Sequence, residues 1–323
     1  MRVFLTGATG FVGGHLAPAL VEHGHEVSAL VRPGSEGDGL ERLGVRVVRG
    51  DVTDRRSMDA GMRGVDAVCH LATLRGGATA GEHRAVTVEG TENVLRAALN
   101  AGVGRVVHCS TVGVHGRLRR LPADESAPIR PGTAYQAAKA EAERVVMRYL
   151  RRHGLPIVIL RPTAIYGPGD LRSLKLYRTI LSGRLVTPGP ADHPYHVVYV
   201  TDVVQALLRG MDAPDAPGEA YLVADGGPIP QIEMFRAIAR AGGGELRRRR
   251  LPAWPFTLAA ALTPTRSLGR RGSFTKSVHF FTHPRSFDIS KARRDLGYRP
   301  EVDAEEGARR TLAWYRDQGL IPR

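Results

Sequence analysis

The first fourteen residues, MRVFLTGATGFVGG (Met1–Gly14), decide the fold. The apolar run Val3–Leu5 predicts a buried β-strand, and residues 15–21 have apolar positions at helical spacing. The turn between them holds three glycines spaced three residues apart, Gly7, Gly10 and Gly13. A glycine loop between a strand and a helix is typical of a pyrophosphate site, because backbone can approach the anion and the helix N-terminus offers free N–H groups. The alternative is that these are ordinary turn glycines in a glycine-rich chain.

Length and composition fit a globular α/β protein. With 323 residues and 42% hydrophobic content, the chain can form one large domain, or a nucleotide-binding domain with a smaller lobe. No apolar run reaches the roughly 20 residues of a transmembrane helix, and the first strand begins too early for a signal peptide, so no integral membrane segment is expected. Cys69 and Cys109 lie in strand-like runs, which indicates reduced thiols in a cytoplasmic protein.

The net charge of +14 comes mostly from arginine. Such a charge suits nucleic acid, an anionic membrane surface or an anionic ligand. No aromatic residues interleave with the arginine runs as a base-stacking surface requires, so no nucleic-acid partner is expected. We interpret the runs as solvated faces that also help to bind a phosphorylated cofactor; they lie at 117–120, 148–152, 247–250 and 266–271.

Strand-like and helical segments alternate, with short connections, through the first half of the chain. Further strands are predicted at 25–31, 45–49, 65–72, 105–110 and 155–160, and helices at 54–62, 86–100 and 133–152. The alternation predicts an α/β fold, a Rossmann-type doubly wound parallel sheet with a smaller, mostly helical C-terminal substrate lobe. We expect the dinucleotide-binding domain to span 1–166, with 196–226 returning to it, and the substrate lobe to span 167–195 and 227–323.

The end of the second predicted strand indicates which dinucleotide binds. An acidic residue there would accept hydrogen bonds from the ribose hydroxyls of NAD, but the strand ends in Val31-Arg32. An arginine suits a 2′-phosphate, so NADP(H) is preferred, with NAD(H) as the alternative. Arg32 as a plain loop arginine is the competing interpretation. Asp51, after the third strand, is expected near the adenine.

Two residues on the predicted helix after the fifth strand have a spacing that suits proton transfer. Tyr135 and Lys139 are four residues apart, so they share one helix face. A tyrosine hydroxyl can donate a proton to a carbonyl oxygen during hydride transfer, and its ordinary pKa of about 10 is lowered by a nearby ammonium group. A surface tyrosine is the alternative interpretation of Tyr135.

In order and spacing, these motifs resemble those of the extended short-chain dehydrogenase/reductase superfamily, also called the NAD-dependent epimerase/dehydratase family. The resemblance covers nearly the whole chain. Within the family, the sequence most resembles 3β-hydroxysteroid-dehydrogenase-like and dihydroflavonol-reductase-like members. It is carried by TGATGFVG at 6–13, Asp51-Val52, His70-Leu71-Ala72, Ser110-Thr111 before Val114-His115-Gly116, Tyr135 and Lys139, Arg161-Pro162 before Tyr166-Gly167-Pro168, Val200-Thr201-Asp202, and the C-terminal segment 287–300.

The resemblance implies the functional residues. Thr111, Tyr135 and Lys139 are the expected catalytic set, with Ser110 as the fallback for Thr111. The expected cofactor-binding residues are Gly7, Thr9, Gly10, Phe11, Val12, Arg32, Asp51, Val52, Leu71, Ala72, Thr73, Tyr135, Lys139, Pro162 and Thr163. The expected substrate-binding residues are Thr73, Val112, Ala164, Tyr195 and His196, and no metal is expected. A homodimer through residues 86–100 and the helix carrying Tyr135 is also implied, although Val145, Val146, Tyr149 and Leu150 would equally suit the core.

Three departures from the family pattern bear on the substrate. Thr87 stands where many members have an asparagine, which puts a fourth, proton-relaying group in doubt. Ala164 and Tyr195 replace the asparagine and arginine with which nucleotide-sugar enzymes grip a diphosphate. Together with His193 and His196, Tyr195 suggests a mixed polar and aromatic pocket; a surface loop is the alternative.

We therefore expect an NADP(H)-dependent oxidoreductase that reduces a ketone, or oxidises the alcohol, on a relatively apolar small molecule. One alternative is a nucleotide-sugar epimerase or dehydratase that uses bound NAD. The other is a catalytically silent dinucleotide-binding protein. The apolar stretch 251–262 is compatible with a lid over the substrate, a patch on an anionic membrane, or an ordinary helix of the small lobe.

Overall fold

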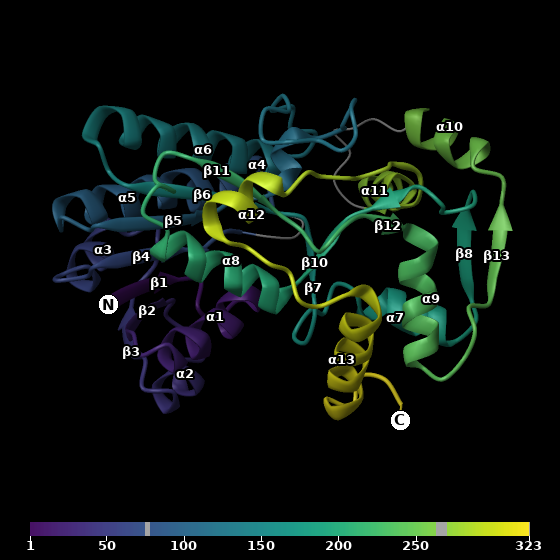
Figure 1. The fold of residues 1–323 in the computed structure, drawn as a ribbon, viewed down its shortest axis with the longest axis horizontal. Helices are drawn as coiled ribbons and strands as arrows, with labels where there is room; N and C mark the ends of the chain where they lie inside the picture. Colours follow the sequence, from purple (N-terminus) through teal and green to yellow (C-terminus); the bar gives the residue numbers. More distant parts are fainter. Residues whose placement is uncertain (75–77, 263–269, 323) are drawn as a thin grey trace.

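A seven-stranded parallel sheet forms the centre of the protein in the computed structural model, which describes residues 1–74, 78–262 and 270–322. The strand order is β11-β6-β5-β4-β1-β2-β3, so the order reverses beside β1 (Figure 1). Ligands of such sheets bind outside the carboxyl ends of the strands at this switch point. The strands are β1 (Arg2–Thr6), β2 (Glu26–Val31), β3 (Arg46–Arg49), β4 (Ala67–His70), β5 (Arg105–Cys109), β6 (Ile157–Pro162) and β11 (Ala220–Val223).

Helices cover both faces of this sheet, which confirms the predicted doubly wound fold. In Figure 1, α5 (Gly90–Asn100) and α6 (Ala134–His153) lie above the sheet, and α1 (Phe11–Glu22) and α8 (Val200–Asp212) lie below it. Side chains of a strand alternate between the two faces, so Val3 and Leu5 join the core under α1 while Phe4 joins the core under α5. Both faces are apolar, as a parallel sheet requires. The smaller helices α2 (Asp38–Arg42) and α3 (Arg55–Gly61) follow β2 and β3.

The helix predicted at 86–100 begins earlier than expected. A capping box between Thr79 and Glu82 starts α4 (Ala80–His83), and a π-helical segment, η1 (Arg84–Glu89), joins it to α5. A π-helical turn changes which side chains face the sheet and is frequent at functional sites. Its position, directly before the α5 residues that pack on the sheet, could be seen only in the structure.

The second half of the chain adds short strands and helices beside the carboxyl end of the sheet. The strands form three pairs: β7 (Ala164–Tyr166) with β10 (Val197–Tyr199), β9 (Pro194–Tyr195) with β12 (Ile229–Pro230), and β8 (Leu185–Pro188) with β13 (Arg248–Leu251). The helices are α7 (Leu174–Leu181), α9 (Gln231–Ala241), α10 (Trp254–Leu262), α11 (Arg270–Thr282) and α13 (Ala304–Asp317). This lobe is mostly helical, as expected.

The arginine run 247–250 lies largely at the surface, as expected, because Arg247, Arg249 and Arg250 are exposed. Arg248 differs, since it is half-buried in strand β13 and donates hydrogen bonds to Thr187 Oγ1 (3.0 Å) and the Pro190 carbonyl (2.9 Å). Helix α12 (Ser290–Leu296) packs on β11, so part of the stretch 227–323 contacts the large sheet. The division into two domains therefore stays a prediction.

No helix in the described part of the chain is both long and apolar enough to span a bilayer. Of the residues considered for a dimer face, Val145, Val146 and Tyr149 are buried within the single chain.

Candidate functional site

Two glycines of the loop after β1 could not carry a side chain without a shift of the backbone. Gly7 has φ +76°, and a Cβ there would lie 2.9 Å from the Ala72 nitrogen. A Cβ on Gly13 would lie 2.1 Å from the Gly7 carbonyl oxygen. Gly10 precedes α1, whose first turn has no side-chain cap and no acidic residue. The free N–H groups at this helix end fit a pyrophosphate.

A buried chain of hydrogen bonds joins this loop to the loop after β4. Thr6 Oγ1 accepts a hydrogen bond from the Ala72 N–H (3.3 Å) and lies 2.7 Å from His70 Nδ1. His70 Nε2 lies 2.9 Å from Thr91 Oγ1. Burial, together with the charge of Lys139, lowers the pKa of His70 to about 3. His70 is therefore neutral and structural, and through Thr6 it supports the backbone at Ala72 beside the glycine loop.

The three predicted catalytic residues come from the end of β5 and the start of α6. Thr133 caps α6, accepting a hydrogen bond from the Gln136 N–H (3.2 Å), so Tyr135 lies in the first turn and is half-buried. Lys139, one turn later, is 2% exposed and donates to the Cys109 carbonyl (2.8 Å). Thr111 follows β5 and is half-buried.

The geometry distinguishes between the two hydroxyls that could assist catalysis. Ser110 is buried, and its Oγ donates to Glu143 Oε1 (2.5 Å), so this hydroxyl is committed to the protein. Thr111 Oγ1 accepts from the Gly113 N–H (3.1 Å), which leaves its O–H as a donor. The arrangement therefore supports Thr111, while its role stays a prediction.

A buried ion pair fixes this end of the sheet. Arg161, at the end of β6, donates to both carboxylate oxygens of Glu143 on α6, at 3.0 and 2.7 Å. The two side chains are only 8% and 3% exposed. Since Ser110 shares Glu143, the pair ties β5, β6 and α6 together one turn after Lys139.

His83 is a neighbour of Tyr135 that the sequence did not reveal. Its ring meets the Tyr135 ring edge to face, with centroids 5.9 Å apart. The side chain is 2% exposed, and Nδ1 has no hydrogen-bond partner among the described residues. Its signal in the sequence was weak, because its approach to Tyr135 depends on the unpredicted α4 before the π-helical segment.

The predicted substrate-binding residues have different surroundings. Thr73 Oγ1 lies 3.2 Å from Thr87 Oγ1 (at the place of the family's asparagine), and Ala164 is exposed. Tyr195 is buried, and its ring packs edge to face on Phe280 of α11 (centroids 5.6 Å apart). Val112 is half-buried in η2 (Val112–His115).

His196 is held by the protein itself. Its Nδ1 accepts a hydrogen bond from the Phe287 N–H (3.2 Å), so the hydrogen of a neutral ring sits on Nε2, which lies 3.0 Å from Asp225 Oδ1. Both nitrogens thus have internal partners in this structure. A substrate role for His196 stays a prediction that this geometry does not support.

The adenosine end of the expected cofactor site carries a second arginine. Arg32 is exposed just after β2, and Arg49 of β3 lies opposite Val31 in the strand register. Arg49 donates to the Ser35 carbonyl (2.8 Å) and so shapes the loop after Arg32. Asp51 Oδ1 accepts from both the N–H and the hydroxyl of Thr53.

The remaining predicted cofactor residues line the same edge of the sheet. Thr163, directly after β6, is buried, and its hydroxyl has no partner among the described residues. An orphaned hydroxyl at this edge fits a hydrogen bond to the cofactor.

The other predicted cofactor residues differ in exposure. Phe11 is half-buried at the start of α1, and the Arg172 guanidinium lies 5.6 Å from the centre of its ring. Thr9 is exposed, whereas Val12 and Val52 are buried. Pro162 ends β6.

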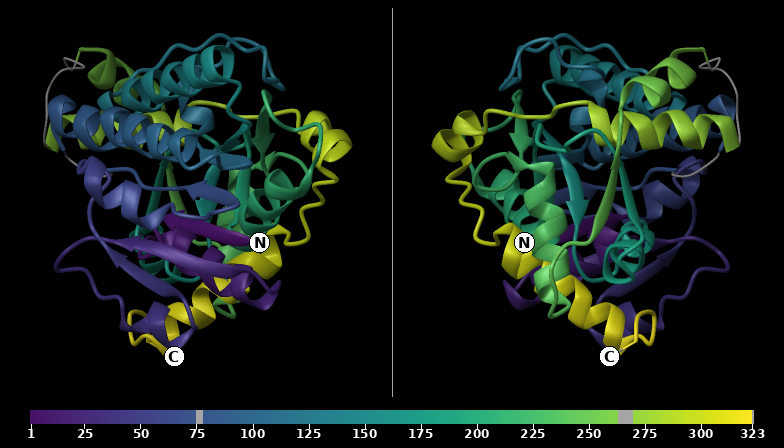
Figure 2. Two further views of the ribbon diagram at one scale, coloured as in Figure 1. Left: turned by 90° about the vertical axis from the view of Figure 1, so that its left-hand side faces the viewer. Right: turned by 90° about the vertical axis from the view of Figure 1, so that its right-hand side faces the viewer.

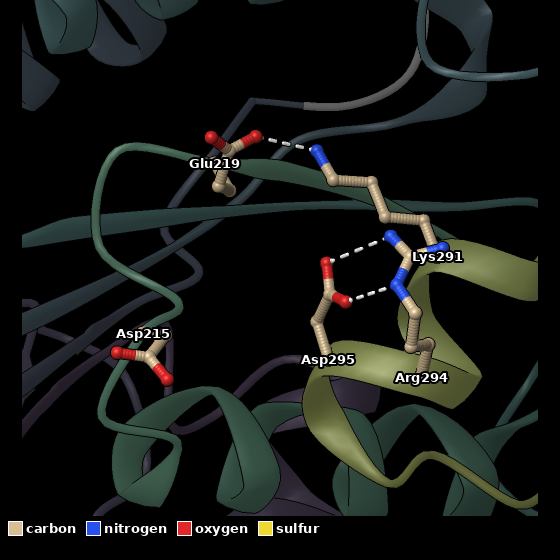
Figure 3. A pocket seen from close by; sticks show the side chains of 5 residues that line it. All are labelled: Asp215, Glu219, Lys291, Arg294 and Asp295. Atoms are coloured by element: carbon tan, nitrogen blue, oxygen red, sulfur yellow. Dashed lines mark hydrogen bonds and ion pairs between the residues drawn. The ribbon is translucent and has the colours of Figure 1, made fainter.

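One surface hollow, of about 530 Å³, lies between α12 and the start of β11, where Lys291 pairs with Glu219 and Arg294 pairs with Asp295 (Figure 3). None of the residues that line it is a predicted site residue. A second hollow, of about 560 Å³, is lined by Arg117, Leu118, Arg119 and Arg130. No group of three or more His, Cys, Asp or Glu side chains in the described residues could hold a metal ion.

A sheet of this order, a glycine loop at its switch point and a Tyr-x-x-x-Lys helix beside it define an enzyme of the extended short-chain dehydrogenase/reductase type. The family model for the NAD dependent epimerase/dehydratase family matches residues 3–224, and the chain belongs to that family.

Three similar proteins illustrate the range of the family. A 4-hydroxy-2-methyl-3-oxo-4-farnesyl-3,4-dihydroquinoline-1-oxide ketoreductase of Stigmatella aurantiaca is 32% identical over 95% of this chain and 94% of its own. A 3-beta-hydroxysteroid dehydrogenase of Mycolicibacterium neoaurum is 30% identical over 98% and 92%. The structure of DesIV, a dTDP-glucose 4,6-dehydratase of Streptomyces venezuelae with NAD bound, superposes with a TM-score of 0.79, at 27% identity over 100% and 99% of the chains. These relatives support an oxidoreductase.

Proposed function

We propose that this protein is an NADP(H)-dependent oxidoreductase that reduces a ketone, or oxidises the corresponding alcohol, on a relatively apolar small molecule. The observation that carries the proposal is the buried Lys139 ammonium, held by the Cys109 carbonyl one helical turn from Tyr135. The ketoreductase and steroid dehydrogenase relatives support the substrate class, because a farnesyl chain and a steroid are both largely apolar.

The roles follow from the chemistry of each group. When bound, NADPH supplies a hydride to the carbonyl carbon. The Tyr135 hydroxyl donates a proton to the carbonyl oxygen, which completes the alcohol, and accepts it in the reverse direction. The Lys139 charge favours loss of that proton, and the Thr111 hydroxyl hydrogen-bonds the same oxygen.

The catalytic assignment is tested with Tyr135→Phe and the pair Thr111→Ala and Ser110→Ala. Ketone reduction, followed by loss of NADPH absorbance, should fall by well over tenfold in Tyr135→Phe, a barrier increase above about 1.4 kcal/mol. Thr111→Ala should lower kcat. Ser110→Ala should instead lower the free energy of unfolding, because it removes one of the hydrogen bonds to the buried Glu143 carboxylate. Activity of Tyr135→Phe within tenfold of wild type contradicts the assignment.

The cofactor preference is tested by titrating both dinucleotides. Arg32, exposed just after β2, and Arg49, opposite Val31 on β3, are the cations that we expect to bind a 2′-phosphate. NADP(H) should therefore bind more tightly than NAD(H), and Arg32→Glu should reverse the order. Arg46→Glu, at the opposite end of β3, is the matched control and should not. Tighter binding of NAD(H) by the wild type contradicts the preference.

The alternative function is a nucleotide-sugar dehydratase or epimerase, which the similarity to DesIV favours. Such an enzyme ends its cycle without net redox, so it would retain NAD through purification and show no net absorbance change during turnover. A catalytically silent protein would bind dinucleotide and turn over no member of a broad ketone panel.

A further inference from the structure

Helix α10 is an apolar helix with almost no cover. Its sequence, WPFTLAAAL, has Thr257 as its only polar side chain, yet only Ala260 among its residues is buried. Trp254, Leu258 and Leu262 are 68%, 54% and 76% exposed. Residues at i, i+4 and i+8 share one face of a helix, so these three form an apolar stripe that points to solvent. This exposure shows that the stretch is not a buried helix of the small lobe.

The position of α10 leaves that stripe accessible. The helix follows β13, an edge strand of a two-stranded sheet, and lies at the outer edge of the molecule in all three views (Figures 1 and 2). Helix α10 packs against α11. Large exposed apolar side chains gathered on one element mark a contact surface, because single ones are normally scattered.

The charge around α10 specifies the kind of surface it meets. The sequence has no aspartate or glutamate from Leu246 to Phe287, and arginines stand on both sides of the helix, at 247–250 and at 266, 270 and 271. Arg249 and Arg250 are exposed on β13, directly before the helix. The described residues thus place an apolar stripe beside cations with no anion of the same segment to neutralise them.

We propose that α10 docks on the surface of an anionic lipid bilayer, with Trp254, Leu258 and Leu262 inserted among the lipids and Arg249 and Arg250 on the phosphates. Interfacial helices combine these two contributions, apolar insertion and attraction of basic residues to acidic headgroups. A second copy of the chain is a poorer occupant, since pairing two such faces would bring arginine against arginine. A docked α10 would give the enzyme access to ketones that dissolve in the bilayer.

The test uses vesicles of phosphatidylglycerol mixed with phosphatidylcholine, and vesicles of pure phosphatidylcholine. Trp254 is one of two tryptophans, so Trp314→Phe makes it the sole tryptophan reporter. Its emission should shift to shorter wavelength with the anionic vesicles, and the wild-type chain should sediment with them. Leu258→Glu should weaken binding by roughly tenfold or more, the loss expected for one buried leucine. Leu43→Glu, an exposed leucine after α2, is the matched control and should bind as wild type. Added salt should weaken binding.

Three outcomes overturn the proposal of a bilayer contact. They are absence of binding to the anionic vesicles, equal binding to vesicles of pure phosphatidylcholine, and unchanged vesicle binding by Leu258→Glu. A lower molecular mass of Leu258→Glu than of wild type in solution, without vesicle binding, would instead assign the stripe to a contact between copies. A raised KM of Leu258→Glu for a water-soluble ketone, without vesicles, would assign it to a lid. Since vesicle binding is measured without ketone or cofactor, its failure is distinct from failure of the proposed reaction.

Discussion

Two adjacent glycines at the start of α1 offer a sharp test of the site. Gly13 and Gly14 occupy the same turn, but a Cβ on Gly13 would lie 2.1 Å from the Gly7 carbonyl oxygen and 2.7 Å from Ala8 Cα, whereas a Cβ on Gly14 would meet nothing within 4 Å. Ordinary van der Waals contact begins at 3.4 Å, so Gly13→Ala must widen the first gap by about 1.3 Å. Both neighbours are backbone atoms, which cannot rotate away as a side chain could.

The two substitutions should therefore have opposite effects on stability. Forcing a methyl group into a packed contact costs about 1–3 kcal/mol, so Gly13→Ala should lower the free energy of unfolding by about that amount. Gly14→Ala should raise it by about 0.5–1 kcal/mol, because alanine is the better helix former and the site is open. Displacement of the Gly7 loop should also weaken dinucleotide binding in Gly13→Ala alone.

The measurements are urea unfolding followed by circular dichroism and dinucleotide titration followed by fluorescence, on both variants and the wild type. Unfolding free energies of the two variants that move in the same direction would refute the argument from packing. Unchanged dinucleotide affinity in a destabilised Gly13→Ala would refute the assignment of this loop as the pyrophosphate site.

Three further predictions concern buried groups around the site. Arg161→Leu should lower the free energy of unfolding by about 3–5 kcal/mol, since it leaves the buried Glu143 carboxylate without a positively charged partner. Adding Glu143→Leu should recover part of that loss, and a double-mutant cycle with no coupling between the two would contradict the ion pair. Because burial lowers the pKa of His70 to about 3, below its unfolded value near 6.5, the unfolded state binds the extra proton between those values. The free energy of unfolding should therefore fall with decreasing pH below 6.5, and His70 should contribute up to about 1.4 kcal/mol per pH unit to that fall. His70→Gln should remove this contribution. An unchanged pH slope in His70→Gln would argue against the lowered pKa of His70. His83→Phe should keep kcat because it keeps a ring against Tyr135, whereas His83→Ala should lower it; equal losses would show that the imidazole nitrogen is needed.

Much of the fold could be predicted because its signals are local. The run Val3–Leu5, the glycine spacing after it and the helical pattern that follows each depend on a few neighbouring residues, and the alternation of such units leaves few sheet topologies. The pair Tyr135 and Lys139 is of the same kind, since helix geometry alone puts them on one face.

Other parts of the site depend on contacts between residues distant in sequence. Ser110 and Thr111 are neighbours, and the sequence does not distinguish their hydroxyls. In the structure, Ser110 donates to the buried Glu143 carboxylate, whereas the Thr111 hydroxyl remains able to donate. The nitrogens of His196 are taken by Phe287 and Asp225, far along the chain. No local pattern contains such partners.

The sequence by itself determined the class of fold, the glycine loop after β1 and the helix that carries Tyr135 and Lys139, because backbone preference and periodicity decide these within a few residues. Only the tertiary structure decided which polar groups are satisfied internally and which apolar groups are left uncovered. The stretch 251–262 shows the difference: its composition allowed a core helix, a lid or a surface patch. Burial is a property of what packs against a segment, and here only Ala260 of α10 is buried.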